Sequence, residues 1–141
     1  MKKKLIYILF TSVILTIGGC SKDTSVSEIT LTQRLLSNKT WYLDYVQAIK
    51  ATGTSTKTYL GQSTYFINFL KDLTTQDADG LNGTYSVEKI NGQLQIHVQA
   101  KTASANLVKY IYNIETIGER NLVLYYTISD QTTKQYYSNN K

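Results

Sequence analysis

The sequence predicts an all-β protein, an up-and-down antiparallel meander that closes into a barrel of about eight strands, with a short N-terminal helix. The chain has 141 residues, no proline and twelve tyrosines, and Thr and Ser are frequent. Tyr, Thr, Val and Ile favour the pleated surface of a strand. From Thr40 onward apolar and polar residues alternate, and turn residues separate the alternating runs. A meander with one apolar face must close or be covered, and a barrel does this economically.

The N-terminus has the layout of a secretory signal peptide over residues 1–19. Lysines occupy positions 2–4, and the apolar run Leu5–Ile17 that follows carries no charge. A membrane-spanning anchor is the rival interpretation. Residues 5–19 are only 15 residues, which as a helix would reach about 22 Å, short of the roughly 30 Å hydrocarbon core of a bilayer.

The run Ile17-Gly18-Gly19-Cys20 resembles a lipobox, the cleavage site of bacterial lipoproteins. The resemblance implies that Cys20 becomes the lipid-bearing first residue of the mature chain and anchors it firmly in a membrane. Cys20 is the only cysteine, so an internal disulfide is excluded. The run Cys20–Asp23 is similar to the start of many Bacteroidetes lipoproteins, which implies the outer membrane and export to the cell surface.

Cleavage leaves 122 residues (141 − 19), which we divide into a lipidated tether, 20–27, and one domain, 28–141. The mature chain has 12 basic residues (15 − 3) and 10 acidic ones, a net charge of +2. These charges are interspersed. A nucleic-acid partner would require a basic stripe, so we expect none.

The domain opens with a stretch, Glu28–Ser37, whose apolar spacing predicts a short helix that caps one end of the barrel. In the first strand, Trp41, Leu43 and Tyr45 are expected on one face. Asn91-Gly92 lies between two alternating runs and predicts a tight hairpin. The polar stretch 71–82 is expected to be a long loop. The remaining predicted strands are 56–60, 65–70, 83–90, 93–99, 107–117, 121–129 and 133–137.

The stretch Leu35–Leu43, Leu-Leu-Ser-Asn-Lys-Thr-Trp-Tyr-Leu, resembles the opening of the lipocalin-like lipoprotein domains of Bacteroidetes. An Asp-Gly and Gly-Thr-Tyr run at 79–85 and a Leu-Val-Leu strand at 122–124 agree with it. Asn38 replaces the usual Gly and tolerates the same left-handed turn. Lipocalins pack an arginine over the tryptophan, and Arg120 and Lys134 are the candidates for that role.

Three functional hypotheses remain open. The first is a binding module, in which the open barrel end holds a small apolar or amphipathic ligand against Trp41, Leu43, Tyr65, Ile67, Tyr85, Ile96 and Tyr112. The second is a filled barrel whose outer face contacts another envelope, host or glycan surface. The third is a hydrolase, which requires His97, the only histidine, to be buried beside a Ser and an Asp. We favour a non-enzymatic protein without metal or cofactor, and interpret the calcium-like stretch 77–88 as a solvated loop.

Overall fold

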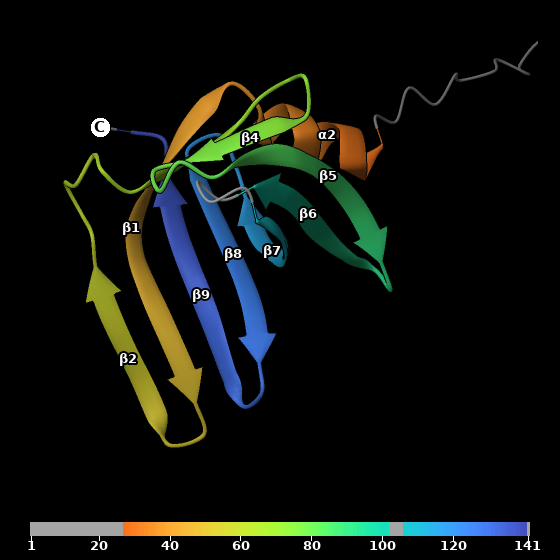
Figure 1. Ribbon diagram of the computed structural model, residues 1–141. Coiled ribbons are helices and arrows are strands. Elements are labelled where there is room, and N and C mark those ends of the chain that lie inside the picture. Colours follow the sequence, from red (N-terminus) through yellow and green to blue (C-terminus); the bar gives the residue numbers. More distant parts are fainter. Residues whose placement is uncertain (1–26, 102–105, 141) are drawn as a thin grey trace, which may run out of the picture.

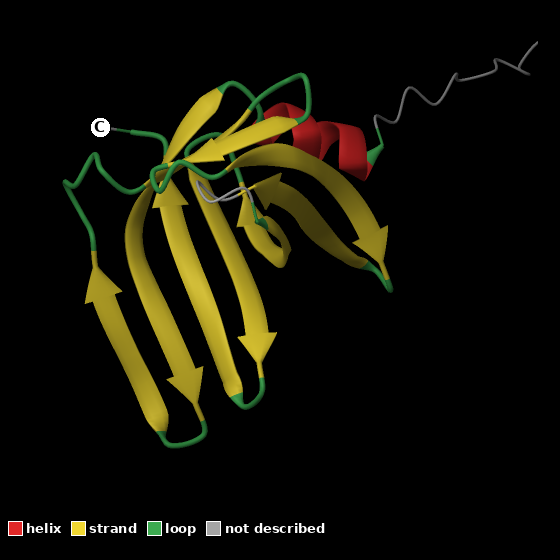
Figure 2. Cartoon of the chain, in the orientation of Figure 1, coloured by secondary structure: helices red, strands yellow, loops and turns green. Residues whose placement is uncertain are grey.

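The computed structural model describes residues 27–101 and 106–140, so the signal peptide, Cys20 and all of the tether except Ser27 lie outside the described residues. In these two described ranges a single helix precedes nine strands (Figures 1 and 2). Their bounds are α2 Glu28–Leu36, β1 Lys39–Lys50, β2 Gly53–Thr58, β3 Phe66–Phe69, β4 Thr74–Asp77, β5 Asn82–Ile90, β6 Gln93–Lys101, β7 Leu107–Ile117, β8 Asn121–Ile128 and β9 Gln131–Ser138.

Eight of the strands close into an antiparallel barrel, which confirms the predicted fold class. The first half of β1 pairs with β3, and each strand from β3 to β8 pairs with the one that follows it. The barrel closes because β9 pairs back onto β1, from Tyr42 opposite Ser138 to Ile49 opposite Thr132. β2 pairs only with the second half of β1 and extends that side of the barrel as an edge strand (Figure 1).

The prediction that residues 71–82 form a loop is wrong, because they contain the barrel strand β4. Its sequence, Thr-Thr-Gln-Asp, has no apolar residue and gives no alternating hydrophobic signal. Pairing with β3 and β5 on both sides supplies its backbone partners. Thr75 is buried in it and donates its hydroxyl to the carbonyl of Asn68 at 2.8 Å, so a polar residue occupies a core position.

The prediction that Trp41, Leu43 and Tyr45 share a face is also wrong. The β1–β9 register shifts between Leu43 and Tyr45, so Leu43 lies opposite Tyr137 while Tyr45 lies opposite Tyr136. An extra residue in one strand reverses the facing of everything after it. Tyr45 therefore stacks on Tyr136, with ring centroids 4.2 Å apart, on the other face of the sheet from Leu43.

The helix and the predicted Asn91-Gly92 hairpin are confirmed. Ser27 caps α2 by accepting a hydrogen bond from the Thr30 amide. Asn38 has a φ of 60°, as expected for a residue that replaces glycine in a left-handed turn. Asn91 and Gly92 have φ values of 51° and 82°, the signs that a two-residue hairpin turn requires.

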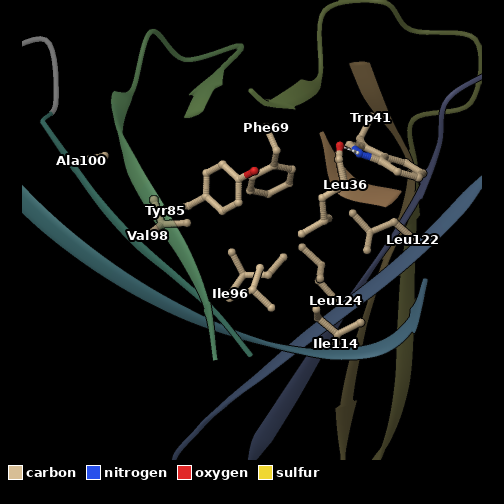
Figure 3. Packing of buried hydrophobic residues seen from close by; sticks show 11 residues of the cluster. Leu36, Trp41, Phe69, Tyr85, Ile96, Val98, Ala100, Ile114, Leu122 and Leu124 are labelled. Carbon is tan, nitrogen blue, oxygen red and sulfur yellow. Dashed lines mark hydrogen bonds between the residues drawn. The ribbon is translucent and has the colours of Figure 1, made fainter. Parts of the chain in front are cut away.

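The end of the barrel that α2 covers is filled with apolar side chains. α2 packs against β5 and β7, and Leu36 from its last turn is fully buried. Figure 3 shows these side chains converging from the helix and the strands. We call this region the packed end; its fully buried members are Leu36, Trp41, Phe69, Ile96, Leu122 and Leu124.

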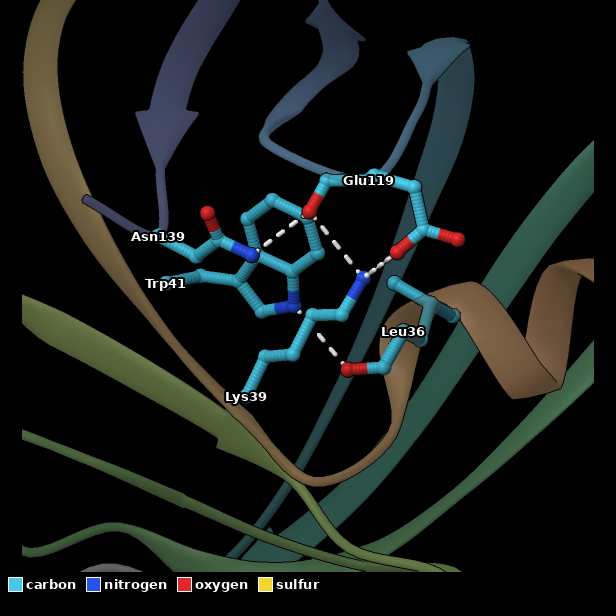
Figure 4. Close-up of polar contacts among 5 residues, drawn as sticks. All are labelled: Leu36, Lys39, Trp41, Glu119 and Asn139. Atoms are coloured by element: carbon cyan, nitrogen blue, oxygen red, sulfur yellow. Dashed lines mark hydrogen bonds and ion pairs between the residues drawn. The ribbon is translucent and has the colours of Figure 1, made fainter.

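Trp41 connects the helix to the barrel. Its indole Nε1 donates to the carbonyl of Leu36 at 3.0 Å, which satisfies both groups without water (Figure 4). The cation over its ring is Lys39, whose Nζ lies 5.6 Å from the ring centroid. Neither candidate from the sequence has this position: Lys134 pairs instead with Glu115, and Arg120 lies in the β7–β8 turn.

Candidate functional site

A cavity of about 270 Å³ lies within the barrel beyond the packed end. This volume is near the lower limit of ligand sites, so it suits a small molecule. The lining residues come from β1, β3, β4, β6, β7, β9 and two connecting segments. They are Leu43, Tyr65, Phe66, Ile67, Thr75, Asp77, Ala78, Asp79, Leu81, Val98, Tyr110, Tyr112, Gln135 and Tyr137.

Backbone pairing fixes the wall that β1 contributes. Leu43 lies opposite Tyr137 across the β1–β9 ladder, and its amide donates to the carbonyl of Tyr65 at 2.9 Å. Tyr65 ends the connection from β2, where its ring packs edge-to-face on Tyr59 at 4.7 Å. The bulge that follows Leu43 therefore moves the inward positions of β1 to Val46, which lies opposite the cavity residue Gln135.

Tyrosine rings form much of the remaining wall. Tyr110 and Tyr112 are two residues apart on β7, and their ring centroids are 6.1 Å apart at an interplanar angle of 23°. Tyr112 in turn packs edge-to-face on Tyr126 of β8. Tyr65 and Tyr110 are 40% and 41% exposed, so rings at the edge of the cavity are open to solvent.

Asp77 at the end of β4 places a carboxylate in this wall. Its Oδ1 accepts from the amides of Asp79 at 2.9 Å and Leu81 at 3.0 Å, an arrangement that shapes the turn into β5. Burial raises the pKa of Tyr112 and of Tyr137 well above the usual value for a phenol, and the Asp77 charge contributes to both shifts. These two hydroxyls are therefore neutral at pH 7 and lie within the field of the carboxylate.

The side-chain oxygen of Gln135, on β9, is a hydrogen-bond acceptor that receives no hydrogen bond from the described residues. This atom, Oε1, is buried. A buried polar atom normally has a partner, and leaving one unpaired costs roughly 1–3 kcal/mol. Gln135 also lines the cavity, so this unpaired acceptor belongs to a residue of its wall.

The structure divides the seven residues predicted to bind a ligand into two groups. Leu43, Tyr65, Ile67 and Tyr112 line the cavity. Trp41, Tyr85 and Ile96 lie instead in the packed end or beside it, and are at most 4% exposed. The sequence reasoning missed Asp77 because β4 was interpreted as a loop. Gln135 and Tyr137 were detectable, since their positions alternate with Thr133 on the predicted last strand.

His97 lies in a second, outer depression and lacks triad geometry. It is partly exposed, and its Nε2 is 3.0 Å from Gln95 Oε1. Ser86 donates to Glu88 Oε1 at 2.9 Å, and His97 Nδ1 is 3.9 Å from that same oxygen. The carboxylate thus lies between the hydroxyl and the imidazole, whereas activating a serine requires the imidazole to be in the middle.

The residues that the structure describes contain no group of three potential metal ligands. In the same residues no helix is both long enough and apolar enough to span a membrane. Comparisons with protein-family models, curated proteins and solved structures find no significant match to this chain. Function is therefore inferred from the geometry of the cavity.

Proposed function

We propose that this protein is a lipid-anchored envelope lipoprotein whose lipocalin-like barrel binds a small apolar or amphipathic ligand and has no enzymatic activity. The observation that carries the proposal is the cavity of about 270 Å³ in a barrel whose other end is closed by packed side chains. A wall lined largely by hydrophobic and aromatic residues, with a few polar groups among them, is typical of ligand sites. Here the polar groups include Asp77, Asp79, Gln135 and the hydroxyls of Tyr112 and Tyr137.

The anchoring part of the proposal rests on the sequence. The lipobox-like run ending at Cys20 would place two or more acyl chains at the N-terminus, which is sufficient for stable attachment. We infer attachment to the outer membrane, on the cell-surface side. Residues 21–27 then separate the lipid from α2.

The first test is native mass spectrometry of the protein purified gently from its own host's envelope. A stoichiometric added mass that disappears on denaturation is the expected result, and it would give the mass of the ligand. A bare protein mass in repeated preparations would contradict ligand binding. It would favour the second candidate, an interaction module that contacts another envelope, host or glycan surface. We rank that candidate second because it requires a filled barrel.

The same preparation tests the anchor independently. Diacylglyceryl and N-acyl modification would add a covalent mass to a peptide that begins at Cys20. We expect this mass to remain after denaturation, and to be absent from a Cys20→Ser variant, which should accumulate with its signal peptide uncleaved. A mature chain without lipid on Cys20 would overturn the proposed anchor and leave the cavity argument intact.

A further inference from the structure

The cavity has an uneven distribution of charge. Among its lining residues in the described ranges of the chain, the charged side chains are Asp77 and Asp79, and none is Lys, Arg or His. Lys57 lies near the edge of the cavity, with its Nζ 5.0 Å from the centroid of the Tyr59 ring that packs on Tyr65, but it does not line the cavity. Among the lining residues themselves, a ligand therefore meets negative charge and no cationic side chain.

Acceptors in the cavity lining retain capacity for further hydrogen bonds. Gln135 Oε1 is buried without a donor among the described residues. The carboxylate of Asp77 receives its two hydrogen bonds from backbone amides, both on Oδ1. Thr75, another buried side chain of the lining, already donates its hydroxyl to the carbonyl of Asn68. A ligand that donates hydrogen bonds would use this remaining capacity.

The tyrosine rings add a third property that favours a cation. Tyr65, Tyr110, Tyr112 and Tyr137 all line the cavity. The face of an aromatic ring attracts a cation placed within about 6 Å of its centroid. Burial raises the pKa values of Tyr112 and Tyr137, so both side chains stay protonated and add no negative charge to the cavity. A carboxylate ligand, such as a fatty acid, would instead be buried beside a like charge, which is costly.

We propose that the ligand of this cavity is a small aliphatic amine, bound with its ammonium group between Asp77 and Gln135 and its hydrocarbon part against Leu43, Ile67 and the tyrosines. This inference rests on the proposed binding function and specifies the chemical class of its ligand. The ammonium group donates hydrogen bonds to both side chains and neutralises Asp77. Its hydrocarbon part replaces water along the apolar wall.

The test uses the protein isolated from its own host's envelope, stripped of any bound molecule by dialysis and held in phosphatidylcholine nanodiscs. Calorimetric titrations compare three probes of equal chain length: hexylammonium, 1-hexanol and hexanoate, each corrected with empty nanodiscs. We expect hexylammonium to bind at least about tenfold more tightly than 1-hexanol, the ratio that one charge-assisted hydrogen bond provides. Hexanoate is expected to bind most weakly.

Asp77→Asn isolates the charge. The amide retains an oxygen for the amides of Asp79 and Leu81, so the turn should persist while the negative charge is lost. The preference for hexylammonium over 1-hexanol should then fall to less than about threefold. Asp130→Asn makes the same change in the β8–β9 turn, outside the cavity lining, and should leave the preference unchanged.

The possible failures are distinguishable. If 1-hexanol binds and hexylammonium binds no more tightly, or if Asp77→Asn leaves their ratio unchanged, the amine inference is wrong and the binding function stands. Tightest binding of hexanoate would overturn the inference in the same way. If none of the three probes binds, the cavity does not accept ligands of this kind, and the proposed function fails together with the inference.

Discussion

The two ends of the barrel interior differ in how their side chains satisfy one another. At the packed end, six large apolar side chains are less than 2% exposed, and the one polar hydrogen on them, on Trp41 Nε1, has its acceptor on the adjoining helix. At the cavity end, tyrosines and Gln135 surround about 270 Å³ of space, and a buried acceptor has no donor among the described residues. The side chains of the packed end thus satisfy one another, whereas the cavity end retains open space and an acceptor without a donor in the described part of the chain.

Under the proposed function, this difference separates stability from binding along a single barrel. Close packing maximises dispersion and apolar burial, so the packed end should account for most of the folding free energy. Unfilled volume and an unpaired acceptor both reduce stability, and they persist in a fold that can tolerate their cost. We therefore expect substitutions at the two ends to have effects of different kind and size.

Trp41→Ala should give the largest effect. It removes a fully buried ring together with the hydrogen bond to Leu36, and such truncations cost about 3–5 kcal/mol. The measurement is the free energy of unfolding in urea. Tyr65→Ala is the matched control, because its ring is 40% exposed at the cavity, and it should cost less than about 1 kcal/mol. Equal costs for the two variants would refute the division between the ends.

The second largest effect should be a loss of stability at alkaline pH, which acts through the cavity end. The folded-state pKa values of Tyr112 and Tyr137 are raised, chiefly by burial. A phenol in the unfolded chain ionises near pH 10, so the contribution of these groups is complete below that pH and is lost as pH rises toward their folded values. Each can remove up to about 1.4 kcal/mol per pH unit.

Urea unfolding at pH 9, 10 and 11 measures this loss. Replacing both tyrosines by phenylalanine removes the ionising groups and keeps the rings, so the stability of the double variant should fall less steeply above pH 10. A slope identical to that of the unaltered protein would show that these phenols are ionised equally easily in both states.

Gln135→Met should stabilise the protein. Methionine has a similar length and removes the buried oxygen that has no donor among the described residues, a change worth roughly 1 kcal/mol in favour of the folded state. Gln47→Met is the matched control, because Gln47 Oε1 accepts from the Tyr136 hydroxyl at 2.9 Å and its loss should destabilise. Opposite signs in urea unfolding are expected. A destabilising Gln135→Met would mean that its amide already has a partner.

Sequence reasoning predicted the secondary structure of the packed end, because its signals are local, but assigned Trp41, Tyr85 and Ile96 to the open end of the barrel. The helix, the alternation through Leu122 and Leu124, and the Asn91-Gly92 turn each depend on a few neighbouring residues. Alternation also reached some of the cavity, since Leu43, Tyr65, Ile67 and Tyr112 line it. A period of two predicts which side chains face inward, but the depth of each in the barrel depends on strand tilt and stagger. Trp41 and Ile96 face inward and lie at the packed end for that reason.

The polar half of the site was not predictable from these signals. β4 has no apolar residue, so its pairing depends on neighbours distant in sequence, and Asp77 was assigned to solvent with it. The bulge after Leu43 leaves no mark in an alternating sequence, although it turns Tyr45 outward. Lys39 over Trp41 was missed because the resemblance directed attention to an arginine late in the chain.

The smallest predicted effect lies at the rim of the packed end. Lys39 Nζ donates to Glu119 Oε2 at 2.7 Å and to its carbonyl at 3.0 Å, and this hydrogen bond, with the lysine charge, lowers the pKa of Glu119 (Figure 4). A lowered folded-state pKa gives stability that is present above the ordinary value near 4.5 and lost as pH falls through the folded value.

Lowering the pH from 5 to 3 should therefore reduce the free energy of unfolding of the unaltered protein slightly more than that of the Glu119→Gln variant. The glutamate is exposed, so water and salt screen the pair, and the difference should shrink further at high ionic strength. The carbonyl of Glu119 also accepts from Asn139, a contact that the substitution leaves in place. A large difference in unfolding free energy between the two proteins at acid pH would contradict this expectation. It would mean that the Lys39–Glu119 ion pair, rather than apolar packing, holds Lys39 over Trp41 and closes this end of the barrel.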